Sequence, residues 1–207
     1  MTRSTPDASG VLAGRIVLDD RVEPGRIVVR RGTIAGVELS DGESAGPLLA
    51  PGFVDVHVHG WGGHDAMHGV AALERMAAAL VRHGVTSFLP TAVTAPLSAL
   101  GEFADSVRAW LPRAAPDAAQ PLGFNFEGPF ISPARKGAQN PAFIQVPADV
   151  AATALEPLLD GLRLITIAPE VPGALELIGW LRGRGVAVSL GHSAATEAQA
   201  RAGYAAG

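Results

Sequence analysis

From residue 48 onward, short apolar segments alternate with longer segments of helical periodicity. Strands are predicted at 53–58, 86–90, 122–127, 163–168 and 186–190. Helices are predicted at 70–82, 97–111, 173–182 and 194–206. Alternating strands and helices build a parallel sheet with right-handed crossovers, so the pattern predicts an α/β fold. The chain holds five such units, whereas a closed (β/α) barrel holds eight, and we expect it to stop before a sixth strand.

The residues before this pattern have a different character. Runs rich in Ile and Val at 14–18, 25–30 and 33–39 are separated by turn-forming pairs. They predict a small antiparallel sheet, followed by a Gly-, Ser- and acid-rich linker at 41–47. Residues 1–10 are polar, lack the apolar run of a signal peptide and predict a frayed tail. We therefore expect a small β domain at 1–47 and an α/β domain at 48–207.

Composition excludes several classes of function. The formal net charge is −4, from 16 Lys and Arg against 20 Asp and Glu, which argues against a nucleic-acid-binding surface. No uninterrupted apolar run reaches the length of about 18 residues that a membrane span needs. The chain has no Cys, so disulfides and Cys-ligated zinc or iron–sulfur sites are excluded. A metal would have to be held by His and carboxylates.

The sharpest candidate site is the segment Asp55-Val-His57-Val-His59, at the end of the first α/β strand. Residues two apart share a face of a strand, so these three are expected on the inner side and the alternating valines against helices. Two imidazoles at this spacing can chelate one ion, and barrel enzymes place their sites at the carboxyl ends of their strands. The alternative is a pair of surface histidines.

Two further candidates end later strands. Glu127 ends an apolar run, where a carboxylate is costly to bury unless it is paired or binds a metal. Its alternative role is a loop cap. His192 lies just past the strand at 186–190. Because two other candidate sites also lie at strand ends, a metal-ligand role is favoured over that of an ordinary hydrogen-bonded histidine. Ser193 and Thr196 are expected to cap the last helix.

Other polar residues are weaker candidates. His64 and His68 lie in a Gly-rich loop that could line the site, and His83 is expected to cap a helix end. The loop pair Arg135 and Lys136 either approaches an anionic substrate or is solvated.

Six segments together resemble the N-acetylglucosamine-6-phosphate deacetylase family of the amidohydrolase superfamily. They are APGFVDVHVHG, GVTSFLPT, FEGPF, KGAQNPAF, TIAPE and GHSAAT. The resemblance covers 48–207 and implies a (β/α)8-type metal-dependent hydrolase barrel, flanked by a small β domain. It implies hydrolysis of the acetamido group of N-acetylglucosamine 6-phosphate to glucosamine 6-phosphate and acetate, in amino-sugar catabolism. It also implies a cytoplasmic homodimer, with neither nucleic acid nor membrane as a partner.

The resemblance assigns metal-binding roles to four residues. Glu127 and His192 match metal ligands of the family, and His57 and His59 match the pair used by members with a second metal. One or two divalent ions per subunit are therefore expected, with zinc first and iron, manganese or cobalt as alternatives. The family takes another metal-binding His from the next strand and its catalytic Asp later still. We therefore expect no catalytic residue in this chain and place that Asp beyond Gly207.

The resemblance also implies a sugar-binding pair. Ala138 and Gln139 match the residues through which the family binds its substrate. Position 139 departs from the family pattern, since a His is usual there, and a His often stands where this chain has Asn125. Gln139 can still donate and accept hydrogen bonds, but it cannot become a cation.

Three alternatives remain beside this hypothesis. A hydantoinase-type enzyme would bridge two metals with a carboxylated lysine at the end of the fourth strand, but the sole lysine, Lys136, lies in a loop. A deacetylase of N-acetylgalactosamine 6-phosphate would share all the motifs. The third alternative is a truncated, non-catalytic homologue, whose fifth strand would leave an exposed sheet edge.

Overall fold

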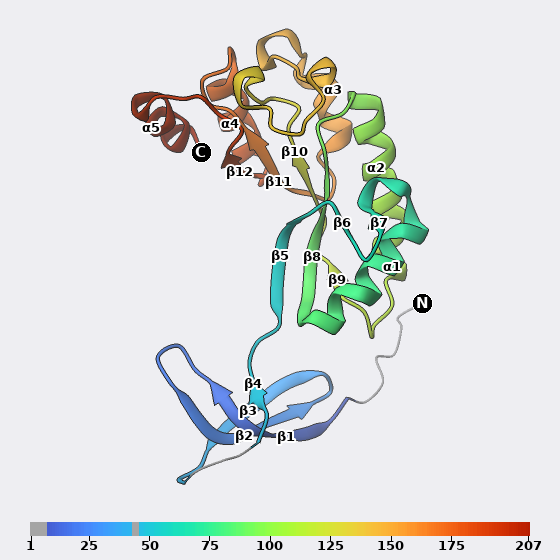
Figure 1. Ribbon diagram of the computed structural model, residues 1–207, viewed down its shortest axis with the longest axis vertical. Coiled ribbons are helices and arrows are strands. Elements are labelled where there is room, and N and C mark those ends of the chain that lie inside the picture. Colours follow the sequence, from blue (N-terminus) through green and yellow to red (C-terminus); the bar gives the residue numbers. More distant parts are fainter. Residues whose placement is uncertain (1–7, 43–45) are drawn as a thin grey trace. The chain divides into compact units, whose positions relative to one another are not determined.

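The computed structural model describes residues 8–42 and 46–207 and shows two compact units, Met1–Gly52 and Phe53–Gly207 (Figure 1). Part of the predicted tail, 1–7, and part of the predicted linker, 43–45, lie outside the described residues. The predicted domain boundary after residue 47 stays a prediction. None of the helices in the described ranges has the length and apolar character needed to cross a membrane.

The first unit is the small sheet unit. Its strands are β1 (Gly10–Val17), β2 (Val22–Arg30), β3 (Thr33–Leu39) and β4 (Leu48–Leu49), in the order β3-β2-β1-β4. The first three are antiparallel, as predicted, and β4 pairs with β1 in parallel. Arg31 and Gly32 join β2 to β3 with positive φ angles of 51° and 74°, a geometry that suits a tight two-residue hairpin.

The second unit is the α/β unit. Its main strands are β5 (Phe53–Val58), β8 (Val85–Ala92), β10 (Phe124–Glu127), β11 (Leu162–Ile167) and β12 (Ala187–Leu190). They are parallel, in the order β12-β11-β10-β8-β5, and the short β9 (Gln120–Pro121) also pairs with β8. The helices are α1 (Val70–Leu80), α2 (Leu97–Trp110), α3 (Ala152–Leu155), α4 (Ala174–Arg182) and α5 (Glu197–Ala206). The predicted α/β fold is confirmed.

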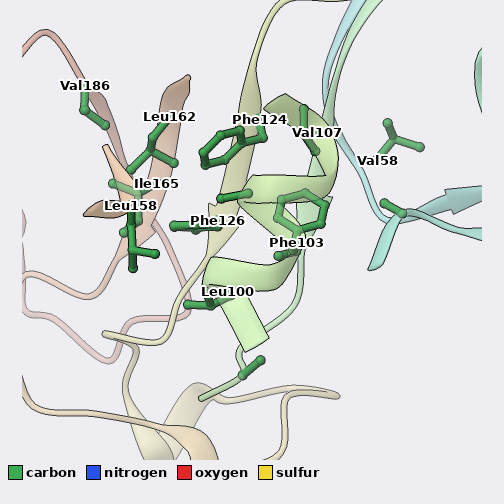
Figure 2. Close-up of a cluster of buried hydrophobic side chains, with 14 of the residues drawn as sticks. Val58, Leu100, Phe103, Val107, Phe124, Phe126, Leu158, Leu162, Ile165 and Val186 are labelled. Carbon is green, nitrogen blue, oxygen red and sulfur yellow. The ribbon is translucent and has the colours of Figure 1, made fainter. Parts of the chain in front are cut away.

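The core of the α/β unit lies between the sheet and its helices (Figure 2). Phe124 and Phe126 of β10 are almost fully buried, and both pack against Phe103 of α2, with ring centroids 5.8 and 6.2 Å apart. The residues that alternate with them, Asn125 and Glu127, contact β5 and the loops beyond the strand ends instead. Strand β10 therefore anchors the sheet through one face and offers polar groups on the other.

The prediction that the valines of β5 pack against helices is wrong for two of them. Val54 and Val56 are 57% and 47% exposed, whereas Val58 is buried. β5 is an edge strand, paired with β8 alone among the described strands. Helix α1, which follows it, contacts β8, α2 and the hairpin of β6 (Gly60–Trp61) and β7 (His64–Asp65) instead.

The last helix starts later than predicted. α5 begins at Glu197, where Thr196 accepts from the backbone N–H of Gln199 in a capping box. Ser193 does not cap this helix, because it lies before the N-cap residue Thr196; its Oγ donates to Glu170 Oε2 at 2.6 Å. Glu170 also accepts from the backbone N–H of Ala194 at 2.6 Å, so it fixes the extended segment between β12 and α5.

Candidate metal centre

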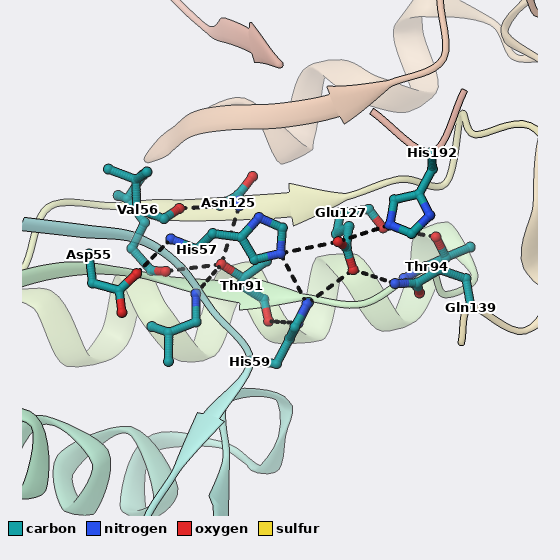
Figure 3. A network of polar contacts seen from close by, with 12 residues as sticks. Asp55, Val56, His57, His59, Thr91, Thr94, Asn125, Glu127, Gln139 and His192 are labelled. Atoms are coloured by element: carbon teal, nitrogen blue, oxygen red, sulfur yellow. Dashed lines mark hydrogen bonds and ion pairs between the residues drawn. The ribbon is translucent and has the colours of Figure 1, made fainter. Parts of the chain in front are cut away.

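Polar side chains from several strand ends meet at one edge of the parallel sheet (Figure 3). His57 lies in β5 and His59 directly after it, Glu127 is the last residue of β10, and His192 follows β12. The carboxyl ends of parallel strands all open at the same edge, so residues distant in sequence come together there. The structure thus brings together the four residues that the sequence singled out as ligands.

The carboxylate of Glu127 is the point on which these side chains converge. Its Oε1 lies 3.2 Å from His57 Nε2 and 3.0 Å from His192 Nε2. Its Oε2 lies 3.0 Å from His59 Nε2 and also accepts a hydrogen bond from Gln139 Nε2. The Nε2 atoms of His57 and His59 are 3.2 Å apart. Three ring nitrogens therefore face one carboxylate, whose side chain is only 13% exposed.

Backbone carbonyls fix the orientation of two of these rings. His59 Nδ1 lies 3.0 Å from the carbonyl oxygen of Thr91, and His192 Nδ1 lies 2.9 Å from that of Arg135. A carbonyl oxygen can only accept, so Nδ1 of each ring carries the hydrogen and donates it. The Nε2 lone pair of the neutral ring then faces Glu127, and the contact requires a proton or a metal cation there. Metal-binding histidines are typically held in this way.

Glu127 and His59 shift each other's titration. The hydrogen bond with His59 lowers the pKa of Glu127 to about 2, helped by His192 and His57 and opposed by burial. The same hydrogen bond raises the pKa of His59, again against the effect of burial. The carboxylate is therefore ionised at neutral pH, and the surroundings favour a positive charge close to it.

This set of donors fits a divalent metal ion. His57, His59 and Glu127 each offer one ligand atom, and these atoms lie within 4.8 Å of one another. Neighbouring ligands of a tetrahedral ion held at about 2.0–2.1 Å are about 3.3–3.4 Å apart. The two imidazole Nε2 atoms, 3.2 Å apart, are close to that spacing, and each lies 3.0–3.2 Å from one of the two Glu127 oxygens. His192 contacts Glu127 from outside this group, so the carboxylate is common to two sets of nitrogen donors.

Asp55 and Asn125 support the site without joining the donor group. Asp55 Oδ1 accepts from the backbone N–H of His57 at 3.0 Å and so steadies the end of β5. Asn125 is fully buried and donates to Thr91 Oγ1 at 3.2 Å and to the carbonyl of Val56 at 3.3 Å. Its Oδ1 has no partner among the described residues.

Thr91 supports this candidate site and was not among the residues predicted from the sequence. It is fully buried near the end of β8, and its Oγ1 accepts from the backbone N–H of Val58 at 3.1 Å while its carbonyl orients His59. The available signal was a threonine near the carboxyl end of an apolar strand, beside the strand that carries the two histidines. A buried hydroxyl there needs partners, and the neighbouring strand end provides them.

The predicted sugar-binding pair lies next to Glu127. Ala138 is exposed, whereas Gln139 is buried and donates to the Glu127 carboxylate. Thr94, which the sequence reasoning also missed, donates from its Oγ1 to the backbone carbonyl of Glu127 at 2.8 Å. Gly128 has a φ of +91°, and a Cβ there would collide with Thr94, so this approach requires glycine.

The remaining histidines lie outside the contacts described around Glu127. The ring of His83 packs edge-on against Trp61, with centroids 5.3 Å apart. His64 lies in β7, and His68 ends a short 3-10 turn before α1.

Comparison with known proteins places the chain in a family. The model of the amidohydrolase family matches residues 48–207. The N-acetylgalactosamine-6-phosphate deacetylase of Escherichia coli O157:H7 is 38% identical over 198 residues, which cover 92% of this chain and 50% of that protein. The human N-acetylglucosamine-6-phosphate deacetylase is 37% identical over 166 residues, which cover 74% of this chain and 39% of that protein.

A solved structure is similar as well. The N-acetylglucosamine-6-phosphate deacetylase of Thermotoga maritima superposes with a TM-score of 0.86 at 31% identity, covering 96% of this chain and 53% of that one. The chain thus spans about half the length of the relatives it matches. The resemblance inferred from the six sequence segments is confirmed. Since the family model matches most of the chain and the fold agrees, the chain belongs to the amidohydrolase family.

Proposed function

We propose that the protein is a metal-dependent deacetylase that hydrolyses N-acetylglucosamine 6-phosphate to glucosamine 6-phosphate and acetate. The observation that carries the proposal is the convergence of three imidazole Nε2 atoms on the Glu127 carboxylate. The names of the similar proteins supply the substrate class, an acetylated amino-sugar phosphate.

In this proposal the four strand-end residues hold the metal. Glu127 and His192 bind one divalent ion, and His57 and His59 with Glu127 provide the donors for a second. Imidazole and carboxylate ligands accept zinc, iron, manganese and cobalt, with zinc as our first choice. The fixed Nδ1–H groups of His59 and His192 leave Nε2 free for the ion, which supports these assignments.

Such an ion would make hydroxide available near neutral pH and polarise the amide carbonyl. The chain's own residues hold that chemistry in place. Glu127, ionised because its pKa is about 2, supplies the negative charge that keeps the ion at the strand ends. Ala138 and Gln139 form the neighbouring wall, where we place the sugar. Arg135 and Lys136, on the same segment, bring positive charge toward a phosphate in a chain whose net charge is −4.

The same resemblance supports three further proposals about the protein. It acts in the cytoplasm, it forms a homodimer, and its α/β domain begins at residue 48. The start of the family match at residue 48 supports the last of these. Size-exclusion chromatography with light scattering tests the homodimer: a monomer at micromolar concentration would contradict it.

The metal assignment is tested by titration. The chain is stripped with a chelator and titrated with Zn²⁺ while bound metal is measured by calorimetry and elemental analysis. We expect one or two tightly bound ions. Glu127→Gln should lose more than the 10–100-fold in affinity that loss of an outer-shell partner costs, as a rough guide. Glu176→Gln, an exposed position on α4, is the matched control and should bind like the wild type.

The substrate assignment is tested with two sugars. Acetate release is followed for zinc-loaded protein that includes the Asp expected beyond Gly207, with N-acetylglucosamine 6-phosphate and, separately, with its galactosamine isomer. Faster release from the glucosamine compound supports the proposal. Preference for the galactosamine compound overturns the substrate, and no release from either overturns the activity.

A further inference from the structure

The side chain of Gln139 is enclosed at the metal centre. Only 6% of the residue is exposed. Its Oε1 accepts from the backbone N–H of Thr94 at 2.8 Å, and its Nε2 donates to Glu127 Oε2. Both ends of the amide therefore have partners inside the protein (Figure 3).

Thr94 decides which way this amide points. A backbone N–H can only donate, so the oxygen of the Gln139 amide must face Thr94 and the NH₂ group must face Glu127. Thr94 Oγ1 also donates to the backbone carbonyl of Glu127 at 2.8 Å. Thr94 thus fixes both the backbone of Glu127 and the side chain that contacts its carboxylate.

The contacts of the carboxylate divide evenly between its two oxygens. Oε1 receives His57 and His192, and Oε2 receives His59 and Gln139. An ionised carboxylate offers about four lone-pair directions, and one contact lies near each of them, three from imidazoles and one from the amide. Gln139 is the only one of the four that cannot change its charge. Its hydrogen bond to Oε2 therefore does not depend on pH or on a bound ion. The other three directions remain for the imidazoles and the metal ion that they would share with the carboxylate.

The segment that carries Gln139 also holds His192. The carbonyl of Arg135 accepts from His192 Nδ1 at 2.9 Å, and Gly137 lies against the same ring. Gly137 has a φ of +58°, and a Cβ there would lie 3.4 Å from His192 Cε1. Residues 135–139 therefore contact two proposed metal ligands that come from different strands.

We propose that Gln139 is a positioning residue that locks the Glu127 carboxylate in the orientation required for metal binding. The inference rests on the proposed metal-binding role of Glu127. It is compatible with a sugar contact, since the Gln139 NH₂ group has two hydrogens and one of them is used by Glu127. It differs from a purely sugar-binding role because it predicts an effect when no sugar is present.

The experiment measures metal binding without substrate. Gln139→Met keeps the length of the side chain and removes the donor. Gln139→Leu also removes the donor, with a shorter and branched side chain, and serves if the first variant fails to fold. Gln139→His restores an N–H donor. Gln120→Leu is the matched control, because the partly buried Gln120 also donates from its amide, to the carbonyls of Ala115 and Ala118.

Affinity for Co²⁺ is measured by competition with a chelator, and the visible absorption spectrum reports the coordination of the ion. Loss of the donor should weaken binding by about 10–100-fold and change the spectrum. Gln139→His should recover most of the affinity, and Gln120→Leu should match the wild type. Wild-type affinity and spectrum in Gln139→Met or Gln139→Leu would overturn the positioning role. A wild-type chain that binds no metal would instead overturn the proposed function.

Discussion

The two compact units differ in how far they bury their apolar side chains. In the α/β unit, β8 buries the whole of its second half, 88–92, next to α1 and α2. In the small sheet unit, Ile16 is the one large apolar side chain in the described residues that is buried, at 4% exposure. Seven others in that unit are about half exposed or more, namely Val11, Leu12, Val22, Ile34, Val37, Leu39 and Leu48.

The difference shows what helices contribute to a sheet. A strand face becomes a core only where a second layer covers it, and in the α/β unit the helices are that layer. Edge strand β5 is an intermediate case, since Phe53 is 69% exposed although Val58 is buried. The candidate metal centre begins on this thinly covered strand. Its position there is held by the hydrogen bonds of Asp55 and Thr91 more than by packing.

The largest effect is expected where the core of the α/β unit is opened. Phe126→Ala removes a ring that is 2% exposed and packs against Phe103 and Phe124. It should lower the free energy of unfolding by about 3–5 kcal/mol. Denaturant unfolding followed by tryptophan fluorescence measures this, because all three tryptophans lie in the α/β unit.

Phe53→Ala is the control for that prediction. It makes the same change on β5, where the ring is 69% exposed, and should cost less than about 1 kcal/mol. Equal losses for the two variants would show that β5 is covered in solution.

The second effect concerns the small sheet unit. Ile16→Thr keeps the β-branched shape but places a hydroxyl where the side chain is 4% exposed. We expect a loss of about 2 kcal/mol, from lost apolar burial and an added polar group. Hydrogen exchange of the β1 and β2 amides is the measurement, since this unit has no tryptophan. Unchanged protection would mean that strand pairing alone holds the sheet.

Much of the fold could be predicted because it follows from local pattern. The α/β strands and helices appear in the predicted order, and β5 spans the predicted 53–58. The predicted start of the last helix was wrong because Thr196 and Gln199 form the capping box, whereas Ser193 lies before the helix and donates to Glu170. The exposure of Val54 and Val56 could not be predicted, because alternation shows which residues share a face and not whether anything covers that face.

The proposed ligands could be selected because strand ends of a parallel sheet meet at one edge. Spacing selected His57 and His59, position at a strand end selected Glu127 and His192, and the resemblance assigned metal-binding roles to all four. The position of Thr91 at a strand end could be seen in the sequence, but the hydrogen bonds of Thr91 and Thr94 could not be predicted. They are made between strands and loops distant in sequence, and a threonine looks the same whether it has such a partner or none.

The third and smaller effect is the pH dependence of the stability that Glu127 provides, and it compares polar with apolar stabilisation inside the α/β unit. Glu127 has its pKa lowered to about 2, so its contribution is present above the ordinary value of 4.5 and is lost as pH falls toward 2. His59 has its pKa raised above 6.5, so its contribution is present below that value and is lost as pH rises through the raised pKa. The wild-type advantage over Glu127→Gln should therefore be largest between pH 4.5 and 6.5.

Urea unfolding of the chelator-treated protein from pH 2 to 8 tests this. Solvent screens the charges of the partly exposed rings, which keeps the difference in unfolding free energy small. We expect an effect below that of Phe126→Ala. A difference between the two proteins that does not vary with pH would show that Glu127 stabilises the unit through packing and not through charge.

The smallest effect is expected at Ile34, an exposed isoleucine of the same sheet that serves as the control for Ile16. Ile34 is 62% exposed, so Ile34→Thr removes little buried apolar area and keeps a β-branched residue in β3. Hydrogen exchange in the β2–β3 pair should change by no more than about 0.5 kcal/mol. A loss equal to that of Ile16→Thr would mean that Ile34 is covered in solution by a second layer. The small sheet unit would then bury its apolar residues as the α/β unit does, with the covering layer supplied from outside the unit.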